Sequence, residues 1–362
     1  MTKNKFASIE SIIKVAKSGS IFILVDDESR ENEGDLVFLG NKCTPKKINF
    51  MAKYGRGLIC LALNKKQSER LGLKLMSHSN LSRFSTAFTV SIEAKKGVTT
   101  GISAFDRSKT ILAAVKSNAK KDDIVSPGHI FPLVAKQGGV LIRAGHTEAS
   151  VDLAKLSING NSAVICEIMN DDGSMAKRDQ LFKFAKKHNL KIAKIEDLIS
   201  YRLKKESFIN EIKRTNLKLK GESFLLRTFK NKIDNKKHLV ITSNDLKKGI
   251  PRVRVIALSD DKVFRKNLLN KYILNNVYYM KKNYSFALVI IQSGMNEDMS
   301  NYIKFSKSDR EFKSNLIRNY GVGAQIIKRL GLKKIVLVTK SKKRIVGLEG
   351  FDIKILKQEI FK

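Results

Sequence analysis

Short apolar runs separated by polar turns are the main pattern in the N-terminal half of the chain. Apolar, β-branched runs bounded by turn residues are typical of buried strands. The predicted strands cover residues 20–26, 35–39, 57–63, 86–92 and 163–169. Helical spacing of apolar residues predicts helices over residues 106–119, 146–157 and 175–189, and a first helix near Ser8 that aligns Ile9, Ile12, Ile13 and Ala16. Strands that alternate with helices predict an α/β domain with a mixed sheet.

A charged stretch separates this pattern from a second one. Residues 204–222 carry many charges and have no clear core periodicity, so we predict a linker there, between a domain over 1–203 and a second over 223–362. In the second domain we predict strands at 238–242, 253–258, 286–291 and 334–338, and a helix over 319–330 that ends at Gly331. The second domain is therefore also predicted to be α/β.

Length and composition agree with two globular domains. A chain of 362 residues with 42% apolar content can bury two cores. The longest apolar runs are far shorter than the roughly 18–20 residues that span a bilayer, and the N-terminus lacks the features of a signal peptide. The three cysteines, Cys43, Cys60 and Cys166, are too scattered for a disulfide framework or a CxxC metal site. We therefore expect a soluble cytoplasmic protein.

The charge is strongly positive, and it is unevenly distributed. The formal net charge is +36 at pH 7. Residues 1–203 hold 33 Lys and Arg against 20 Asp and Glu, which gives +13, and the rest of the chain holds 37 against 14, which gives +23. The basic residues of the second half are interspersed with apolar ones, as on a solvated surface. We therefore do not expect a nucleic-acid ligand, although a basic binding module stays an alternative for this half.

The acidic stretch from Asp26 to Asp35, DDESRENEGD, is the first candidate for chemistry. It concentrates six carboxylates around one arginine and one glycine, between two predicted strands. Such a stretch is often only a solvated turn. In extended geometry, however, Glu31, Glu33 and Asp35 would point to one side, where their oxygens suit Mg²⁺ or Mn²⁺.

A second candidate is the stretch from Arg143 to Asp152, RAGHTEASVD, which precedes a predicted helix. Arg143 supplies a fork of donors, Thr147 a hydroxyl, and the start of the helix free amide groups, which together predict a phosphate-binding site. His146 adds an imidazole at the same turn. A single histidine is more often structural than a metal ligand, but here it accompanies a carboxylate cluster in the same domain.

Five motifs in order now identify a resemblance that covers almost all of residues 6–203. They are RENEGD at 30–35, TTGISAFDR at 99–107, SPGHIFPL at 126–133, RAGHTEASVDLA at 143–154 and CEIMNDDGSMAK at 166–177. This part of the chain resembles 3,4-dihydroxy-2-butanone-4-phosphate synthase. The resemblance implies a lyase that converts D-ribulose 5-phosphate to L-3,4-dihydroxybutan-2-one 4-phosphate and formate in riboflavin biosynthesis, with Mg²⁺ (or Mn²⁺), as a homodimer whose sites lie near the subunit interface.

The resemblance also implies roles for individual residues. Glu31 and His146 would hold the metal. The substrate contacts would be Arg30, Glu31, Asp35, Arg143, Ala144, Gly145, His146, Thr147 and Glu167, with the RAGHT segment on the phosphate. His129 and Glu167 would be essential for the chemistry, and Glu33 and Asp35 are further candidate acids and bases. Cys60 is better explained as a small buried residue than as a participant, and His78 and His188 as surface or structural residues.

Residues 320–351 resemble the C-terminal part of GTP cyclohydrolase II, in which three cysteines hold Zn²⁺. No cysteine follows Cys166, and the stretches after residue 255, at 292–301 and at 340–343 depart from the catalytic pattern of that family. We therefore predict a cyclohydrolase-like fold without zinc and without cyclohydrolase activity. A binding or regulatory module, or a part that only supports dimerisation or stability, is the alternative role for this half.

Overall fold

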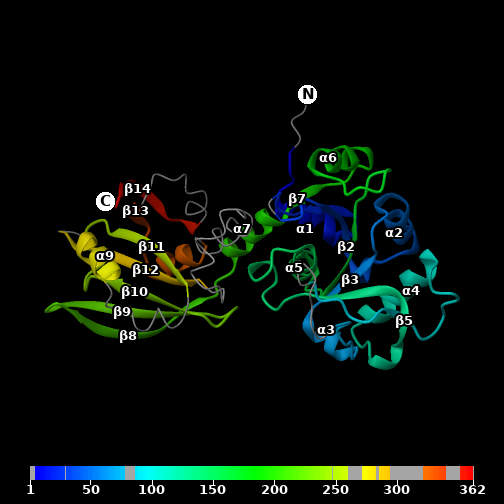
Figure 1. The fold of residues 1–362 in the computed structure, drawn as a ribbon, viewed down its shortest axis with the longest axis horizontal. Helices are drawn as coiled ribbons and strands as arrows, with labels where there is room; N and C mark the ends of the chain where they lie inside the picture. Colours follow the sequence, from blue (N-terminus) through cyan, green and yellow to red (C-terminus); the bar gives the residue numbers. More distant parts are fainter. Residues whose placement is uncertain are drawn as a thin grey trace. The chain divides into compact units, whose positions relative to one another are not determined.

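The computed structural model describes residues 5–28, 30–77, 86–246, 248–259, 271–282, 285–293, 321–339 and 351–361. The chain forms two compact units, Met1–Ile199 and Ser200–Lys362. Each unit contains one seven-stranded sheet, and helices accompany both sheets (Figure 1). The predicted α/β fold is therefore confirmed for both units, and so is the mixed sheet predicted for the first. None of the helices in the described residues has the length and apolar composition needed to cross a bilayer.

The sheet of the first unit has the strand order β4-β5-β3-β6-β2-β1-β7. Its strands are β1 (Phe22–Val25), β2 (Gly34–Leu39), β3 (Cys60–Leu63), β4 (Ile92–Ala94), β5 (Ile124–Val134), β6 (Ser162–Glu167) and β7 (Ile192–Lys194). The β1/β7 and β3/β5 pairs are parallel, and the β1/β2, β2/β6, β3/β6 and β4/β5 pairs are antiparallel. Strands distant in the sequence therefore lie side by side at the centre of the sheet.

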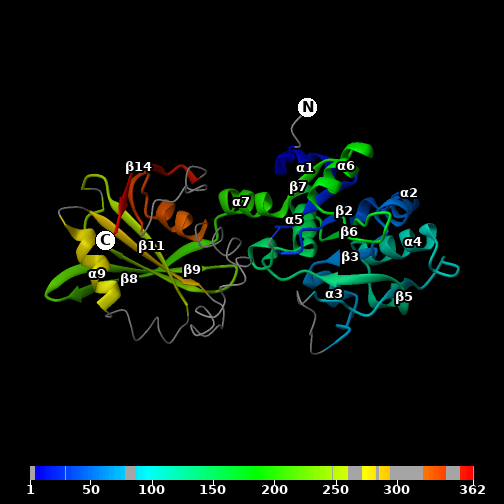
Figure 2. The ribbon, with the colours of Figure 1, turned by 45° about the horizontal axis from the view of Figure 1, so that its top comes forward.

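Helices cover both faces of this sheet, as two views of the ribbon show (Figures 1 and 2). One face packs against α1 (Ile9–Lys17) and α5 (His146–Ile158), and the other against α2 (Pro45–Phe50), α4 (Ala104–Val115) and α6 (Arg178–Lys187). Shorter elements are α3 (Lys65–Arg70), a π-helical turn over Met51–Gly55, and 3₁₀ turns at Gly40–Lys42, Lys121–Asp123 and Gly139–Leu141.

Coverage of both faces explains why the strands are continuous apolar runs. In β1, Ile23 and Val25 belong to the core beneath α2 and α4, so Phe22 and Leu24 point to the face of α1 and α5. All four residues are buried. A strand buried on both sides has no polar side, and its sequence shows no alternation.

Two predicted elements of this unit differ in the structure. The helix predicted over 106–119 begins earlier, after Ser103, whose hydroxyl accepts a hydrogen bond from the backbone N–H of Asp106, and it ends at Val115. The strand predicted at 86–92 is reduced to isolated bridges at Phe88 and Thr89, with the regular strand β4 beginning only at Ile92. The long strand β5 was not predicted, because the Ser-Pro-Gly sequence within it is typical of a turn.

The sheet of the second unit has the strand order β14-β13-β11-β12-β10-β9-β8. Its strands are β8 (Ile209–Leu219), β9 (Glu222–Asn231), β10 (Lys237–Thr242), β11 (Arg252–Ser259), β12 (Phe286–Ser293), β13 (Lys334–Thr339) and β14 (Lys354–Ile360). The four strands from β14 to β12 are parallel and the other pairs are antiparallel. Helix α9 (Lys271–Lys281) packs Ile273, Val277 and Met280 into the core of this unit, and residues 321–329 are helical.

The linker predicted over 204–222 contains a strand, which corrects that prediction. Residues 209–219 form β8, which pairs antiparallel with β9 through most of its length. It is the edge strand of the sheet, and among its residues only Ile209 and Leu219 are fully buried. An edge strand whose side chains are nearly all exposed or half-buried has the composition of a linker, which explains the error. The departures from the cyclohydrolase pattern predicted at 256–271, 292–301 and 340–343 lie mostly outside the described residues, which include only 256–259, 271, 292 and 293 of these stretches.

Candidate active site

Carboxylates from three adjacent strands of the first unit meet at the edge of the sheet that the strand ends form. Asp26 follows the last residue of β1, Asp35 lies at the start of β2, and Glu167 ends β6. Because these strands are antiparallel neighbours, the register places Asp35 opposite both Leu24 and Glu167. Residues 35 and 167 share the sheet face on which α5 packs, and α5 begins there with His146. The sheet register therefore gathers acidic groups beside one histidine.

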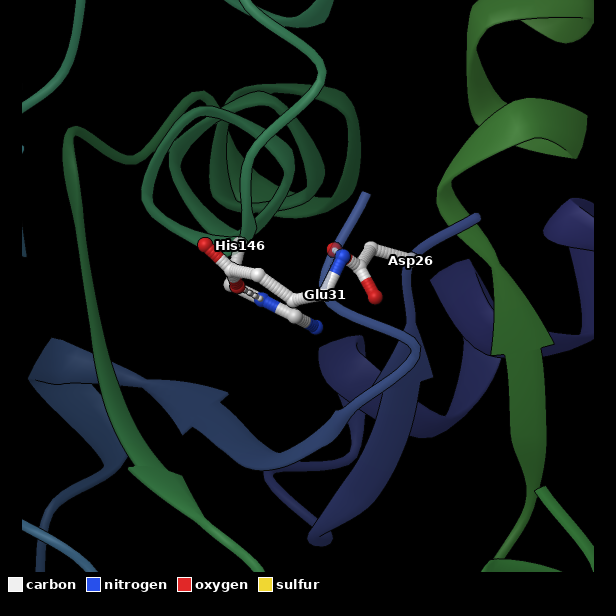
Figure 3. Close-up of side chains that lie close together, drawn as sticks. All are labelled: Asp26, Glu31 and His146. Carbon is white, nitrogen blue, oxygen red and sulfur yellow. Dashed lines mark hydrogen bonds and ion pairs between the residues drawn. The ribbon is translucent and has the colours of Figure 1, made fainter. Parts of the chain in front are cut away.

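Asp26, Glu31 and His146 form a cluster that could hold a metal ion, with ligand atoms all within 4.8 Å of one another (Figure 3). The Nδ1 atom of His146 lies 3.8 Å from Glu31 Oε2 and 3.8 Å from Asp35 Oδ1. Its Nε2 atom is buried without a hydrogen-bond partner among the described residues. Burial lowers the pKa of His146, against the opposing effect of Asp26, so the imidazole is neutral and can offer a lone pair.

Asp26 organises the acidic loop. Its Oδ2 accepts hydrogen bonds from Arg30 Nη1 at 2.9 Å and from the backbone N–H of Glu31 at 3.1 Å, and its Oδ1 accepts from the backbone N–H of Glu33 at 3.0 Å. Arg30 Nη1 also lies 2.9 Å from Glu31 Oε2. The Asp26 carboxylate is thus engaged with the loop itself, and it holds the backbone at Glu31 and the guanidinium of Arg30, which contacts the Glu31 carboxylate.

The extended geometry predicted for residues 31–35 is wrong. Asn32 has a positive φ of 55°, and β2 begins only at Gly34. This turn directs Glu31 towards His146, whereas Glu33 Oε1 lies 3.5 Å from Lys177 Nζ, towards solvent. Asn tolerates the left-handed conformation better than most residues, a local signal that strand alternation alone does not include.

Asp35 and Glu167 form a coupled pair of carboxyl groups. Burial raises the pKa of Asp35 well above its usual value, and the neighbouring Glu167 raises it further. Burial also raises the pKa of Glu167, against hydrogen bonds from backbone N–H groups that include that of Leu58 at 2.8 Å. Asp35 is the more deeply buried of the two, so burial raises its pKa further than that of Glu167. Two neighbouring carboxyl groups with raised pKa values are suited to hold and transfer a proton.

Arg143 lies beside the N-terminus of α5. Its Nη1 donates to Glu148 Oε2 at 2.7 Å and its Nη2 to Thr86 Oγ1 at 2.9 Å. Helix α5 starts after Gly145, which has no capping side chain, so backbone N–H groups at residues 146 and 147 are available at the start of the helix. A Cβ atom at Gly145 would lie 2.4 Å from Arg143 Nη1, which explains the glycine there. The stretch has the donors of an anion-binding site.

His129 lies apart from this cluster among the described residues. It is on β5, which β3 separates from β6, and its Nδ1 atom lies 2.8 Å from Glu93 Oε2. His188 and Cys60 have the surroundings of structural residues. His188 packs edge-on or tilted against Phe50, Tyr54 and Phe184. Burial raises the pKa of Cys60 well above its usual value, and His78 lies outside the described residues.

Three residues that contact predicted site residues were missed: Asp26 and Glu148 at the cluster, and Glu93 beside His129. Asp26 and Glu148 stand inside the two motifs, so the sequence contains the signal but not the partners that each carboxylate selects. Glu93 is the one acidic residue of the short strand β4, between Ile92 and Ala94, and no local pattern connects it to His129.

Comparison with known proteins agrees with this geometry. A family model described as 3,4-dihydroxy-2-butanone 4-phosphate synthase matches residues 10–201, and one described as GTP cyclohydrolase II matches residues 210–359. The chain is 41% identical to the riboflavin biosynthesis protein RibBA of Aquifex aeolicus, over 98% of this chain and 92% of that protein. It is 40% identical to the 3,4-dihydroxy-2-butanone 4-phosphate synthase of Photobacterium phosphoreum, over 97% of this chain and 98% of that protein.

Solved structures give the same result. A two-domain 3,4-dihydroxy-2-butanone 4-phosphate synthase from A. baumannii, RibBX, superposes with a TM-score of 0.83 and 37% identity, over 98% of this chain and 99% of that chain. A synthase in complex with two magnesium ions covers 55% of this chain with a TM-score of 0.54 and 37% identity, and 98% of that chain is matched. The fold and the site define a sugar-phosphate lyase. The chain belongs to the 3,4-dihydroxy-2-butanone 4-phosphate synthase family of riboflavin biosynthesis and carries a GTP cyclohydrolase II domain behind the synthase domain.

Proposed function

We propose that the edge of the first sheet binds D-ribulose 5-phosphate and a divalent cation and converts the sugar phosphate to L-3,4-dihydroxybutan-2-one 4-phosphate and formate. The observation that carries this proposal is the convergence of Glu31 and His146 beside the Asp35 and Glu167 pair. The reaction removes a proton beside a ketone and expels a hydroxyl as water, so it needs groups that accept and donate protons next to a charge-stabilising centre.

Glu31 and His146 would hold the cation, Mg²⁺ or Mn²⁺. The unpartnered Nε2 and the lowered pKa of His146 support a ligand role, and carboxylate oxygen is the preferred ligand of both ions. The magnesium complex of a similar synthase supports a divalent ion in this family. When bound, the cation would supply Lewis acidity towards the oxygens of the ketose.

The segment from Arg143 to Thr147 would bind the phosphate group. Arg143, the small residues Ala144 and Gly145, and the first turn of α5 provide charge and backbone donors within five consecutive residues. Glu148 accepts a hydrogen bond from Nη1 of Arg143 and so fixes the position of its guanidinium group. Small residues at 144 and 145 leave room for a phosphate to approach the backbone amides.

Asp35 and Glu167 would move protons on the substrate. An ionised Glu167 accepts a proton from carbon or hydroxyl, and a protonated Asp35 supplies one to a departing hydroxyl, because their shared site keeps a single proton between them. Arg30 would lie close enough to contact the substrate while it holds Glu31. Two further residues stay candidate acids or bases. Glu33 lies beside Lys177, and His129 lies on β5.

Exposed apolar side chains support a homodimer. Ile102 and Phe105 are 56% and 60% exposed, and both lie within the TTGISAFDR motif of the synthase. Neighbouring exposed apolar side chains are a feature of surfaces that a partner covers. Size determination in solution, with Phe105→Ser as the test and Leu356→Ser as an exposed control in the second unit, is expected to give a dimer that only the first change weakens.

The proposed reaction is tested by incubating the purified chain with ribulose 5-phosphate and Mg²⁺ and measuring formate. Glu31→Gln and His146→Ala are expected to abolish formate release while the circular dichroism spectrum is unchanged. Turnover near that of the parent chain in either variant would exclude the assigned metal ligands.

For the second unit we propose a cyclohydrolase-like domain without GTP turnover. The absence of any cysteine after Cys166 supports this, because the zinc site of that family is built from thiolates. The full chain is expected to purify without stoichiometric zinc and to release no formate from GTP with or without added Zn²⁺. Stoichiometric zinc together with turnover of GTP would contradict the proposal.

A further inference from the structure

Glu93 and His129 form a dyad on the neighbouring strands β4 and β5. Glu93 Oε2 lies 2.8 Å from His129 Nδ1 and accepts a hydrogen bond from the backbone N–H of His129 at 3.2 Å. The carboxylate is largely buried, whereas the side chain of His129 is 43% exposed. One carboxylate oxygen thus binds both the backbone and the ring of the same residue, which orients the ring.

The second oxygen of Glu93 is held from the opposite side. Thr110 of α4 donates its hydroxyl hydrogen to Glu93 Oε1 at 2.6 Å, while its own oxygen accepts from the backbone N–H of Ala94 at 3.0 Å. Thr110 is fully buried, so water does not compete with Glu93 for the hydrogen bond of its hydroxyl group. The carboxylate therefore receives fixed hydrogen bonds on both oxygens.

The TTGIS segment passes directly over this dyad. A Cβ atom at Gly101, whose φ is +89°, would lie 2.2 Å from Glu93 Oε2 and 2.5 Å from His129 Nδ1. Asp106 fixes this segment, because it accepts hydrogen bonds from the backbone N–H groups of Thr99 and Gly101 and from the Thr99 hydroxyl. Only glycine allows the backbone so close, which shields the Nδ1 side of the ring from solvent.

We infer that Glu93 is a positioning residue that keeps the ring proton of His129 on Nδ1 and so leaves Nε2 as a proton acceptor for the substrate. An ionised carboxylate can only accept hydrogen bonds, so the ring nitrogen that faces it must donate. The exposed Nε2 then has a free lone pair directed away from the dyad. The inference rests on the proposed function in one respect, namely that His129 takes part in the reaction.

The tautomer can be measured on the resting protein without any reaction. In a sample with ¹⁵N-labelled histidine, the signal of His129 is assigned by its loss in His129→Gln. The parent chain is expected to carry the proton on Nδ1, and Glu93→Gln is expected to shift the population towards the Nε2 proton. A parent chain with the proton on Nε2 would overturn the inference whatever the activity.

Kinetics then test whether Glu93 acts through His129. Glu93→Gln is expected to lower kcat about 10- to 1000-fold with little change in KM, since an orienting carboxylate affects the proton transfer and not the binding. Thr110→Val is expected to lower kcat by a smaller factor, Thr110→Ser to retain it, and the exposed Asp122→Asn to leave it unchanged. A loss of kcat in Thr110→Val that Thr110→Ser does not show would be due to the lost hydroxyl group and not to a failure to fold.

The double variant Glu93→Gln/His129→Gln decides the question. If Glu93 acts only through His129, the double variant is no slower than His129→Gln alone. Additive losses would overturn the inference. Normal turnover of His129→Gln would refute the participation of His129 in the proposed function and with it the positioning role, and the tautomer measurement would still report separately whether Glu93 holds the ring.

Discussion

Replacement of Asp26 by asparagine tests how the acidic loop is organised. The side chain of Asp26 is completely buried and accepts three hydrogen bonds on two oxygens. Asparagine has one acceptor oxygen. In one orientation this oxygen still accepts the hydrogen bonds from Arg30 and from the Glu31 N–H, and the bond from the Glu33 N–H is lost. In the other orientation only the bond from the Glu33 N–H remains.

The magnitude follows from the better of these orientations. One buried N–H group loses its acceptor and faces another donor, which costs about 1–3 kcal/mol, and the bond to Arg30 loses its charge assistance, which costs about 1 kcal/mol more. The sum is about 2–4 kcal/mol, and its lower end of about 2 kcal/mol corresponds to a roughly 30-fold weaker cation affinity. We expect a loss of between about 10- and 100-fold, as for other groups that orient a metal ligand.

Calorimetric titration of Mg²⁺ or Mn²⁺ into the chain, and the Mg²⁺ dependence of formate release, measure this loss. Glu28→Gln is the matched control, because it removes a carboxylate from the same loop that is 62% exposed and pairs with Arg178 rather than with the cluster around Asp26. It is expected to bind the cation almost as tightly as the parent chain. Equal affinities for Asp26→Asn and the parent would refute the view that Asp26 sets the position of Glu31.

Three further changes have distinct expected outcomes. Arg143→Lys keeps the charge but loses the planar fork, so KM for ribulose 5-phosphate is expected to rise, and an unchanged KM would place the phosphate elsewhere. Gly57→Ala puts a Cβ atom 2.6 Å from both the backbone oxygen and Oε2 of Glu167, so kcat is expected to fall at least about 10-fold, and an unchanged kcat would contradict this reasoning. Burial lowers the pKa of His238 to about 4, so the folded chain is expected to lose stability as pH falls from about 6.5 to about 4, where only the unfolded state gains the proton. His238→Asn keeps an acceptor for the nearby backbone amide and is expected to reduce the pH dependence of the melting temperature, and an unchanged dependence would contradict the assignment.

The sequence by itself determined the elements that rest on local chemistry. Ser8 accepts a hydrogen bond from the N–H of Ser11 and starts α1 where the apolar spacing begins. The central apolar runs form β1, β2 and β6, because a strand buried on both faces has no alternative to continuous apolar composition. The acidic loop and the RAGHT segment were recognised from residue types alone, since carboxylates and phosphate donors must stand in one short stretch to act together.

Only the tertiary structure decided which of these groups meet. The placement of Asp35 opposite Glu167 comes from the β2/β6 register, and the contact of Glu93 with His129 comes from the β4/β5 pairing, and neither register is encoded in a local period. The turn at Asn32 also separates the side chains of Glu31 and Glu33. Strand alternation would place both on one side, but the left-handed backbone at Asn32 changes the direction of the chain between them. Local periodicity specifies which face of an element is buried, but long-range pairing specifies which side chains share a site, and it forms only when the whole sheet is assembled.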